Sequence, residues 1–218
     1  WGKRSGAHIN PAVTLTFFRL KKIAPWDAFF YVLAQFIGGL VGVMLVAWML
    51  RELFTEPPVN YVVTVPGQWG VAIAFLAEFL LSFGLMTMVL VTSNSNLLSN
   101  YTGIFAGIMV ALYITFEAPI SGMSINPART FASAFPSQIW TAVWIYYLAP
   151  PLAMLSAAEL YKRVSGLRTR SICCKLHPNG DTNCISIDCC GQCEALVRPW
   201  NDRDDPLNPA QPPSASIH

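Results

Sequence analysis

Two short segments of the sequence carry side chains that could bind a small polar solute, and they repeat one another. Residues 5–15 have the sequence SGAHINPAVTL and residues 121–131 have the sequence SGMSINPARTF. At a constant offset of 116 residues, seven of these eleven positions are identical. In each copy an Asn-Pro pair begins a short apolar segment, which predicts a helix capped by the Asn side chain with Pro at its first position.

The chemistry expected of these two helix starts is hydrogen bonding to a solute oxygen. If the short helices meet end to end, the positive ends of their dipoles converge and the amides of Asn10 and Asn126 donate to the solute. Backbone carbonyls of residues 6–9 and 122–125 supply acceptors, because irregular backbone inside a membrane occurs where it lines a cavity. The arrangement favours a file of water or another small neutral molecule and opposes cations and protons. The alternative is that both Asn-Pro pairs are only helix caps, which does not explain why the short helix is duplicated.

The composition indicates that a membrane surrounds these segments. The chain has 218 residues, of which 54% are hydrophobic and only 12% are charged, with a net charge of +2. Soluble domains contain about 25% charged residues, so most soluble enzymes and disordered chains are excluded. The near-neutral balance also argues against a nucleic-acid partner. We therefore expect a polytopic protein whose immediate partner is the lipid bilayer.

Uncharged stretches define the elements that must position the two short helices. Residues 28–50, 79–116 and 130–158 contain no Asp, Glu, Lys or Arg, and a membrane-spanning helix needs about 17–25 apolar residues. The expected membrane-spanning helices lie at about 26–53, 69–92, 101–117 and 138–161, and the expected half-helices at about 10–19 and 126–135.

Basic residues set the expected orientation. One cluster, with Arg19, precedes the first long helix, and another, with Lys162 and Arg163, follows the last. Cytoplasmic flanks are rich in Lys and Arg, and four spans between the clusters put both on the same side. We therefore expect a channel-like domain at 1–161 and a cytoplasmic tail at 162–218, Cys-rich and then disordered, in a plasma membrane or bacterial inner membrane.

The paired boxes, the second of which continues as NPAR, resemble the aquaporin or major intrinsic protein family over about residues 1–165. The boxes are Asn10, Pro11 and Ala12, and Asn126, Pro127 and Ala128. The resemblance implies an all-α membrane protein with an aquaporin-like inverted-repeat helical bundle, two half-helices and a homotetrameric assembly. It also implies, with the repeat itself, that about 48 residues forming the first two transmembrane helices are missing before Ser5.

The resemblance assigns a selectivity filter to three residues. Arg129 is its cationic member, and Ile114 and Met123 fall at the two neighbouring filter positions. A buried guanidinium is costly in a membrane and usually faces a water-filled path. The alternative for Arg129 is an interfacial position, which is weaker because the next charge in the chain is Glu159.

The filter residues do not decide between water and a larger neutral molecule as the solute. Water-selective members of the family typically have His at the position of Ile114, so the apolar ring is expected to admit slightly larger neutral solutes. Glycerol channels of the family carry Asp directly after NPAR and a basic residue four positions later, where this chain has Thr130 and Ala134. The sequence is therefore compatible both with a channel for water and with a facilitator for glycerol or small polyols.

The resemblance further assigns pore-lining and supporting residues. The expected pore-lining residues are His8, Ile9, Gly122 and Ser124. His8 resembles a pore histidine on the cytoplasmic side, although a satisfied structural hydrogen bond is the commoner role of a lone His. Glu78 is expected to support the pore-lining loop by accepting hydrogen bonds, rather than to act as an ion site.

The tail contains all six cysteines and a spacing that could hold zinc. Cys174 and His177 are separated by two residues, as are Cys190 and Cys193, which suits a tetrahedral Zn²⁺ site. Free reduced thiols and acylated cysteines are the alternatives. No cofactor is expected in the remainder of the chain.

These observations predict a passive transmembrane channel for water and other small neutral solutes. A membrane-anchored protein that regulates through a metal- or redox-responsive tail is the alternative of another class. An enzyme is not expected, because no Ser/His/Asp or paired-carboxylate arrangement occurs in the sequence.

Overall fold

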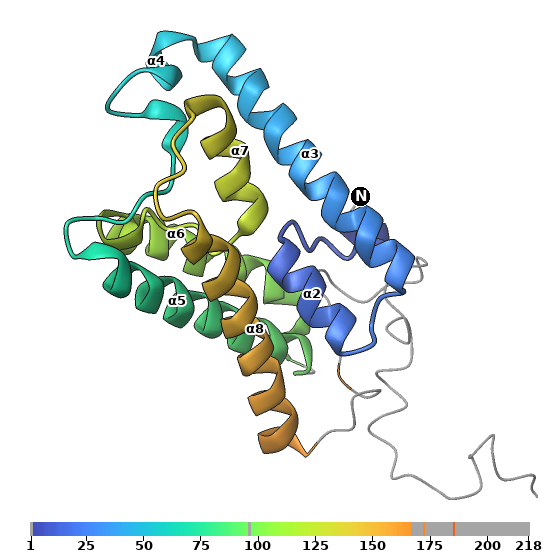
Figure 1. The fold of residues 1–218 in the computed structure, drawn as a ribbon. Helices are drawn as coiled ribbons and strands as arrows, with labels where there is room; N and C mark the ends of the chain where they lie inside the picture. Colours follow the sequence, from blue (N-terminus) through green and yellow to red (C-terminus); the bar gives the residue numbers. More distant parts are fainter. Residues whose placement is uncertain (1, 96, 167–171, 173–184, 186–218) are drawn as a thin grey trace, which may run out of the picture.

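The computed structural model describes residues 2–95, 97–166, 172 and 185, and every regular element in these ranges is helical (Figure 1). The elements are α1 (Gly2–Ser5), α2 (Pro11–Arg19), α3 (Pro25–Leu50), α4 (Glu52–Thr55), η1 (Asn60–Val62), α5 (Gly70–Ser93), η2 (Ser99–Tyr101), α6 (Thr102–Ser121), α7 (Pro127–Ser137) and α8 (Trp144–Ser165). α5 packs along α8, α3 packs against α7, and α2 contacts both α8 and α3.

Three segments are long and apolar enough to cross a membrane. They are Pro25–Leu50, Gly70–Ser93 and Ser99–Ser121. The fourth span expected from the sequence, α8, has 22 residues but is not among them. Pro150 and Pro151 lie inside this helix, and Glu159 and two basic residues occupy its last turns, so its sequence is less apolar.

The boundaries of three long helices differ from those expected. α6 runs to Ser121 instead of 117. The last helix begins at Trp144 rather than near residue 138, because Gln138 and Ala142 adopt positive φ angles of 55° and 50°. A left-handed residue interrupts a right-handed helix. α3 ends at Leu50 instead of 53, because Arg51, with a φ of 48° and a ψ of −129°, lies outside the helical region.

The two half-helices begin where the sequence predicts. α2 has 9 residues and α7 has 11, and each starts at the Pro of its Asn-Pro pair. At about 1.5 Å per residue, neither can cross a hydrocarbon layer of about 30 Å. Each therefore ends within the thickness of the bundle.

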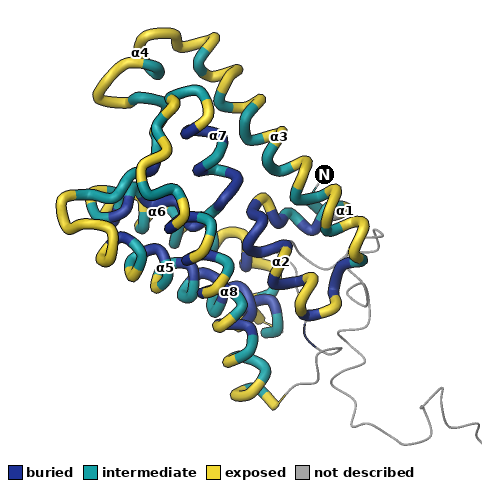
Figure 2. The backbone as a smooth tube through the Cα atoms, viewed as in Figure 1, coloured by how far each residue is buried: buried dark blue, intermediate teal, exposed yellow. Residues whose placement is uncertain are grey.

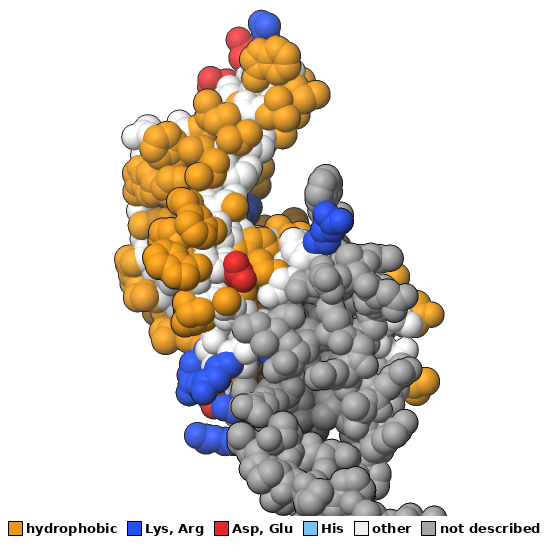
Figure 3. Space-filling view, turned by 90° about the vertical axis from the view of Figure 1, so that its right-hand side faces the viewer, with side chains coloured by type: hydrophobic (Ala, Val, Ile, Leu, Met, Phe, Trp, Pro, Cys, Tyr) orange, Lys and Arg blue, Asp and Glu red, His pale blue; other side chains and the backbone are white. Residues whose placement is uncertain are grey.

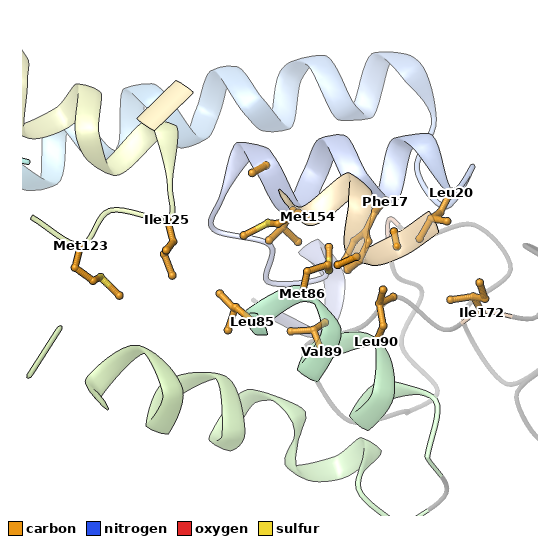
Figure 4. Close-up of a cluster of buried hydrophobic side chains, with 14 residues drawn as sticks. Phe17, Leu20, Leu85, Met86, Val89, Leu90, Met123, Ile125, Met154 and Ile172 are labelled. Carbon is orange, nitrogen blue, oxygen red and sulfur yellow. The ribbon is translucent and has the colours of Figure 1, made fainter. Parts of the chain in front are cut away.

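Apolar side chains from α2, α5 and α8 form the main core (Figure 4). Phe17, Met86 and Met154 are at most 1% exposed and belong to one cluster. On α8, Ala149, Ala153 and Ala157 recur every fourth residue and are buried on one face. Short side chains at this spacing allow helices to approach closely.

α3 is packed much less than α8. None of its 26 residues is buried, whereas dark blue segments line the inner side of α8 and α7 in Figure 2. α3 meets α7 at Gly39, where a Cβ would lie 3.3 Å from the Cβ of Ala132. Figure 3 shows hydrophobic side chains over much of the described surface on the side of α3. A long helix that is apolar all round requires lipid or another helix as its surroundings.

Candidate functional site

Asn10 and Asn126 cap the two half-helices. The Oδ1 atom of Asn10 accepts a hydrogen bond from the backbone N–H of Ala12 at 2.9 Å. The Oδ1 atom of Asn126 accepts from the N–H groups of Ala128 at 3.0 Å and Arg129 at 3.3 Å. These bonds satisfy backbone donors that a helix start leaves open.

The same two side chains join the repeats to each other. The Nδ2 atom of Asn10 donates to the carbonyl oxygen of Ile125 at 2.7 Å, and that of Asn126 donates to the carbonyl oxygen of Ile9 at 3.0 Å. Each Asn therefore bonds the residue that precedes the other Asn. An amide nitrogen carries two N–H groups, so each side chain retains a second donor after making this bond.

The loops before the two Asn residues have the same backbone shape. Positive φ angles recur in the same order at Gly6 (76°) and Gly122 (79°), Ala7 (54°) and Met123 (43°), and Ile9 (55°) and Ile125 (49°). Positive φ is uncommon for residues other than Gly. Its recurrence at an offset of 116 residues shows that the repeat in the sequence is also a repeat in three dimensions.

A buried carboxylate braces the second loop. Glu78 on α5 is 0% exposed. Its Oε1 atom accepts from the Ser124 N–H at 2.6 Å and the Ser121 hydroxyl at 2.8 Å, and its Oε2 atom accepts from the Ile125 N–H at 2.6 Å. The Tyr146 hydroxyl adds a bond of 2.5 Å to the Ser121 carbonyl. The loop that leads to Asn126 is thus held from α5 and α8.

The first loop is held by side chains of α2 and α3. His8 is 3% exposed, and its Nδ1 atom lies 3.0 Å from the Thr14 hydroxyl. The Gln35 amide donates to the same hydroxyl at 3.0 Å, and the His8 N–H donates to the Tyr31 hydroxyl at 3.0 Å. These contacts connect the loop to α2 and α3.

A cavity of about 530 Å³ lies at the junction of the two loops. Among the residues that line it are Asn10, Asn126, Arg129, Ile114, Met123, His8, Ile9 and Ser124. A second cavity of about 600 Å³ between α3 and α7 also reaches Ile9, Asn126 and Arg129. Asn126 and Arg129 therefore face both cavities, with α5 and α6 on one side and α3 on the other.

The family model of the major intrinsic proteins matches residues 1–161. The chain belongs to this family. It is 37% identical over 163 residues to aquaporin NIP2-2 of Zea mays, covering 73% of this chain and 53% of the relative. It is 32% identical over 164 residues to nodulin-26 of Glycine max, covering 75% of this chain and 59% of the relative. The chain thus spans a little over half the length of these curated relatives.

A solved structure shows the fold of the family. The X-ray structure of the aquaglyceroporin from Plasmodium falciparum matches with a TM-score of 0.65 at 22% sequence identity, over 75% of each chain. The aquaporin-like helical bundle expected from the sequence is therefore confirmed. With its apolar helices, this major intrinsic protein is an integral membrane protein.

The structure of this major intrinsic protein brings together most of the residues singled out from its sequence. Six of those in the described ranges do not line the cavity of about 530 Å³. Four belong to the boxes, namely Pro11, Ala12, Pro127 and Ala128, of which Ala128 lines the cavity between α3 and α7. The other two are Glu78 and Gly122. Glu78 lies behind the loop as its brace, and Gly122 packs against residues 64 and 65, where an added Cβ would be 2.9 Å from the Val65 nitrogen. Cys174, His177, Cys190 and Cys193, proposed as zinc ligands, lie outside the described residues.

Sequence reasoning missed several polar residues that hold the site. Thr14 and Thr130 recur at the offset of the repeat and could have been found from it. Gln35, Tyr31 and Thr64 have no such signal, because their contacts join residues far apart in the chain.

Proposed function

We propose that this chain forms part of a passive channel for water and other small neutral solutes. The observation that carries the proposal is the reciprocal pair of Asn bonds, which joins two helix starts beside a cavity. Each Asn has a second N–H for a passing oxygen atom. The similarity to relatives that include aquaporin NIP2-2 supports the same activity.

Ion and proton exclusion follows from the charges around this point. Each half-helix contributes about half a positive charge at its N-terminus, and Arg129 adds a full one in the first turn of α7. A cation would lose its water shell and meet this positive potential. Water can pass, because it carries no net charge and replaces its hydrogen bonds with those of the Asn amides.

The solute class is broader than water alone. Ile114 and Met123, together with Arg129, line the same cavity, so apolar surface faces one positive group there. Such a wall suits a molecule with a carbon skeleton and hydroxyl groups, and a glycerol- or polyol-type facilitator is the second candidate. The matching solved structure is of an aquaglyceroporin, which supports testing glycerol directly.

The remaining assignments concern the assembly and the tail. We propose a homotetramer, no enzymatic activity, and a cytoplasmic tail in a plasma or bacterial inner membrane. The ion pair between Arg19 and Glu159, at 3.1 Å, joins the end of α2 to the end of α8, which supports placing both basic clusters on one side. Zinc bound by Cys174, His177, Cys190 and Cys193 would belong to this tail.

Osmotic shrinkage of vesicles that contain the purified full-length protein tests the channel. Light scattering after a sucrose jump is expected to show faster water efflux than in empty vesicles, and a glycerol gradient then measures solute entry. Vesicles with an unrelated membrane protein at equal mass control for leaky packing. No gain in permeability, together with zinc bound stoichiometrically by the same protein, would favour the regulatory alternative.

A further inference from the structure

A short extended segment packs directly against the loop that leads to Asn126. This strap, residues 63–69, connects η1 to α5, and its Gly67 N–H donates to the carbonyl of Ile120 at 2.9 Å. A Cβ on Gly67 would lie 2.0 Å from the carbonyl oxygen of Pro119. Across the contact, a Cβ on Gly122 would lie 3.0 Å from the Thr64 Cα. Backbone therefore meets backbone, with no room for a side chain between them.

Thr64 connects the strap to the half-helix through a chain of hydroxyl groups. Its side chain is buried, at 3% exposed, and donates to the Thr130 hydroxyl at 3.0 Å. The Thr130 and Ser124 hydroxyls are 2.5 Å apart, and Ser124 donates to the carbonyl of Asn126 at 2.9 Å. With Thr130 donating to Ser124, each of the three hydroxyl protons has one acceptor.

The series of hydroxyl groups extends to Asn126 and to the neighbour of Arg129, the two residues that face the cavity. Ser124 also accepts from the Asn126 N–H at 3.3 Å, and Thr130 follows Arg129 in the first turn of α7. The Nη1 atom of Arg129 is buried and has no hydrogen-bond partner among the described residues. The position of the guanidinium therefore depends on how firmly the first turn of α7 is held.

We propose that Thr64 is a positioning residue that fixes the first turn of α7 and thereby sets the solute selectivity at Arg129. The inference rests on the proposed channel function. Thr64 does not line either cavity, so it acts through Thr130 and Ser124 rather than by touching the solute.

The first loop shows that the strap acts on one side only. Thr14 is the counterpart of Thr130, but it receives its bond from Gln35 on α3. Loss of the Thr64 hydroxyl therefore loosens mainly the loop before Asn126. The loop before Asn10 keeps its own contacts to α2 and α3 and is expected to change less. A general loss of packing would affect both loops to the same extent.

The Thr64→Val variant of the full-length protein, in detergent and in vesicles, tests this proposal. Hydrogen–deuterium exchange at residues 124–130 is expected to rise by about 2- to 10-fold, the effect of one lost hydrogen bond, with a smaller change at residues 6–14. The ratio of glycerol to water permeability is expected to rise in the same variant. Thr64→Ser keeps the hydroxyl, and its exchange rate and permeability ratio are expected to equal those of the wild type. Thr87→Val is the matched control, because its hydroxyl bonds only the Phe83 carbonyl within α5.

Separate outcomes distinguish the two proposals. Unchanged exchange and an unchanged permeability ratio in Thr64→Val would overturn the role of Thr64, as would an equal change in Thr87→Val. A wild-type protein that conducts no solute would overturn the channel, while the exchange measurement would still decide whether Thr64 holds the loop. If Thr64→Val does not fold, Thr130→Val breaks the same chain from α7 and is expected to raise exchange at residues 124–126.

Discussion

The two Asn-Pro-Ala loops present the same groups to the cavity, but different contacts hold them. In both, Asn caps a half-helix and donates to the carbonyl before the other Asn. In both, the Thr four residues after the Asn contacts the residue two positions before that Asn. Thr14 contacts His8 in the first loop, and Thr130 contacts Ser124 in the second. The two loops therefore share their backbone shape and their amide donors, but the side chains that hold them differ.

The difference lies in the charge of the groups that hold the loops. The N–H of Ser124 donates to the carboxylate of Glu78, whereas the N–H of His8 donates to the neutral hydroxyl of Tyr31. A carboxylate makes a stronger acceptor than a hydroxyl, so the second loop is expected to be the more rigid of the two.

Removing the two acceptors in turn is expected to give the largest contrast. Glu78→Ala leaves three buried donors without their acceptor, and we expect a loss of at least about 3 kcal/mol in the free energy of unfolding. Tyr31→Phe removes a single bond and is expected to cost about 0.5–1.5 kcal/mol. Unfolding of the detergent-solubilised protein, followed by circular dichroism, measures both. Equal losses would contradict the difference in rigidity.

Arg129 distinguishes the second half-helix from the first, where Val13 stands at the same position of the repeat. Arg129→Val makes the two alike and removes one positive charge beside the cavity. A barrier lowered by about 1.4 kcal/mol admits ions about tenfold faster, so proton leak is expected to rise by at least that factor. A pH-sensitive dye inside vesicles measures it, with Thr87→Val as control. Unchanged proton flux would remove Arg129 from the barrier.

Asn10→Asp and Asn126→Asp test the shared part of the comparison. Each replaces the donor to the opposite loop by a negative charge and keeps the oxygen that caps the helix. Water permeability is expected to fall by about 2- to 10-fold in each, with a rise in cation leak. Swelling and ion-flux measurements on the same vesicles compare the variants. A large effect in only one would show that the two Asn residues are not equivalent.

A small effect, of the same size as that of Tyr31→Phe, is expected from Gln35→Leu. This change removes the α3 contact to Thr14, which keeps its contact to His8, and we expect about 0.5–1.5 kcal/mol of lost stability. Faster hydrogen–deuterium exchange should be confined to residues 6–14. Faster exchange at residues 122–130 would indicate that the two loops are coupled more tightly than their separate contacts imply.

Much of this arrangement could be predicted because its signals are local. An Asn-Pro pair specifies a cap and a first helical residue within two positions, and the offset of 116 residues relates the two copies. The start of α8 could not be predicted in the same way, since Gln138 and Ala142 adopt positive φ without a Gly to indicate it. The bond from Thr64 spans 66 residues and leaves no pattern in the sequence.

Water and proton flux, measured together on vesicles with the full-length protein, test the central claim most directly. Water should pass the two joined Asn donors in single file, while the converging helix N-termini and Arg129 exclude protons. We therefore expect osmotic water permeability well above that of empty vesicles, and proton permeability equal to theirs. Water flux no higher than in empty vesicles, or proton flux that rises along with it, would contradict the account.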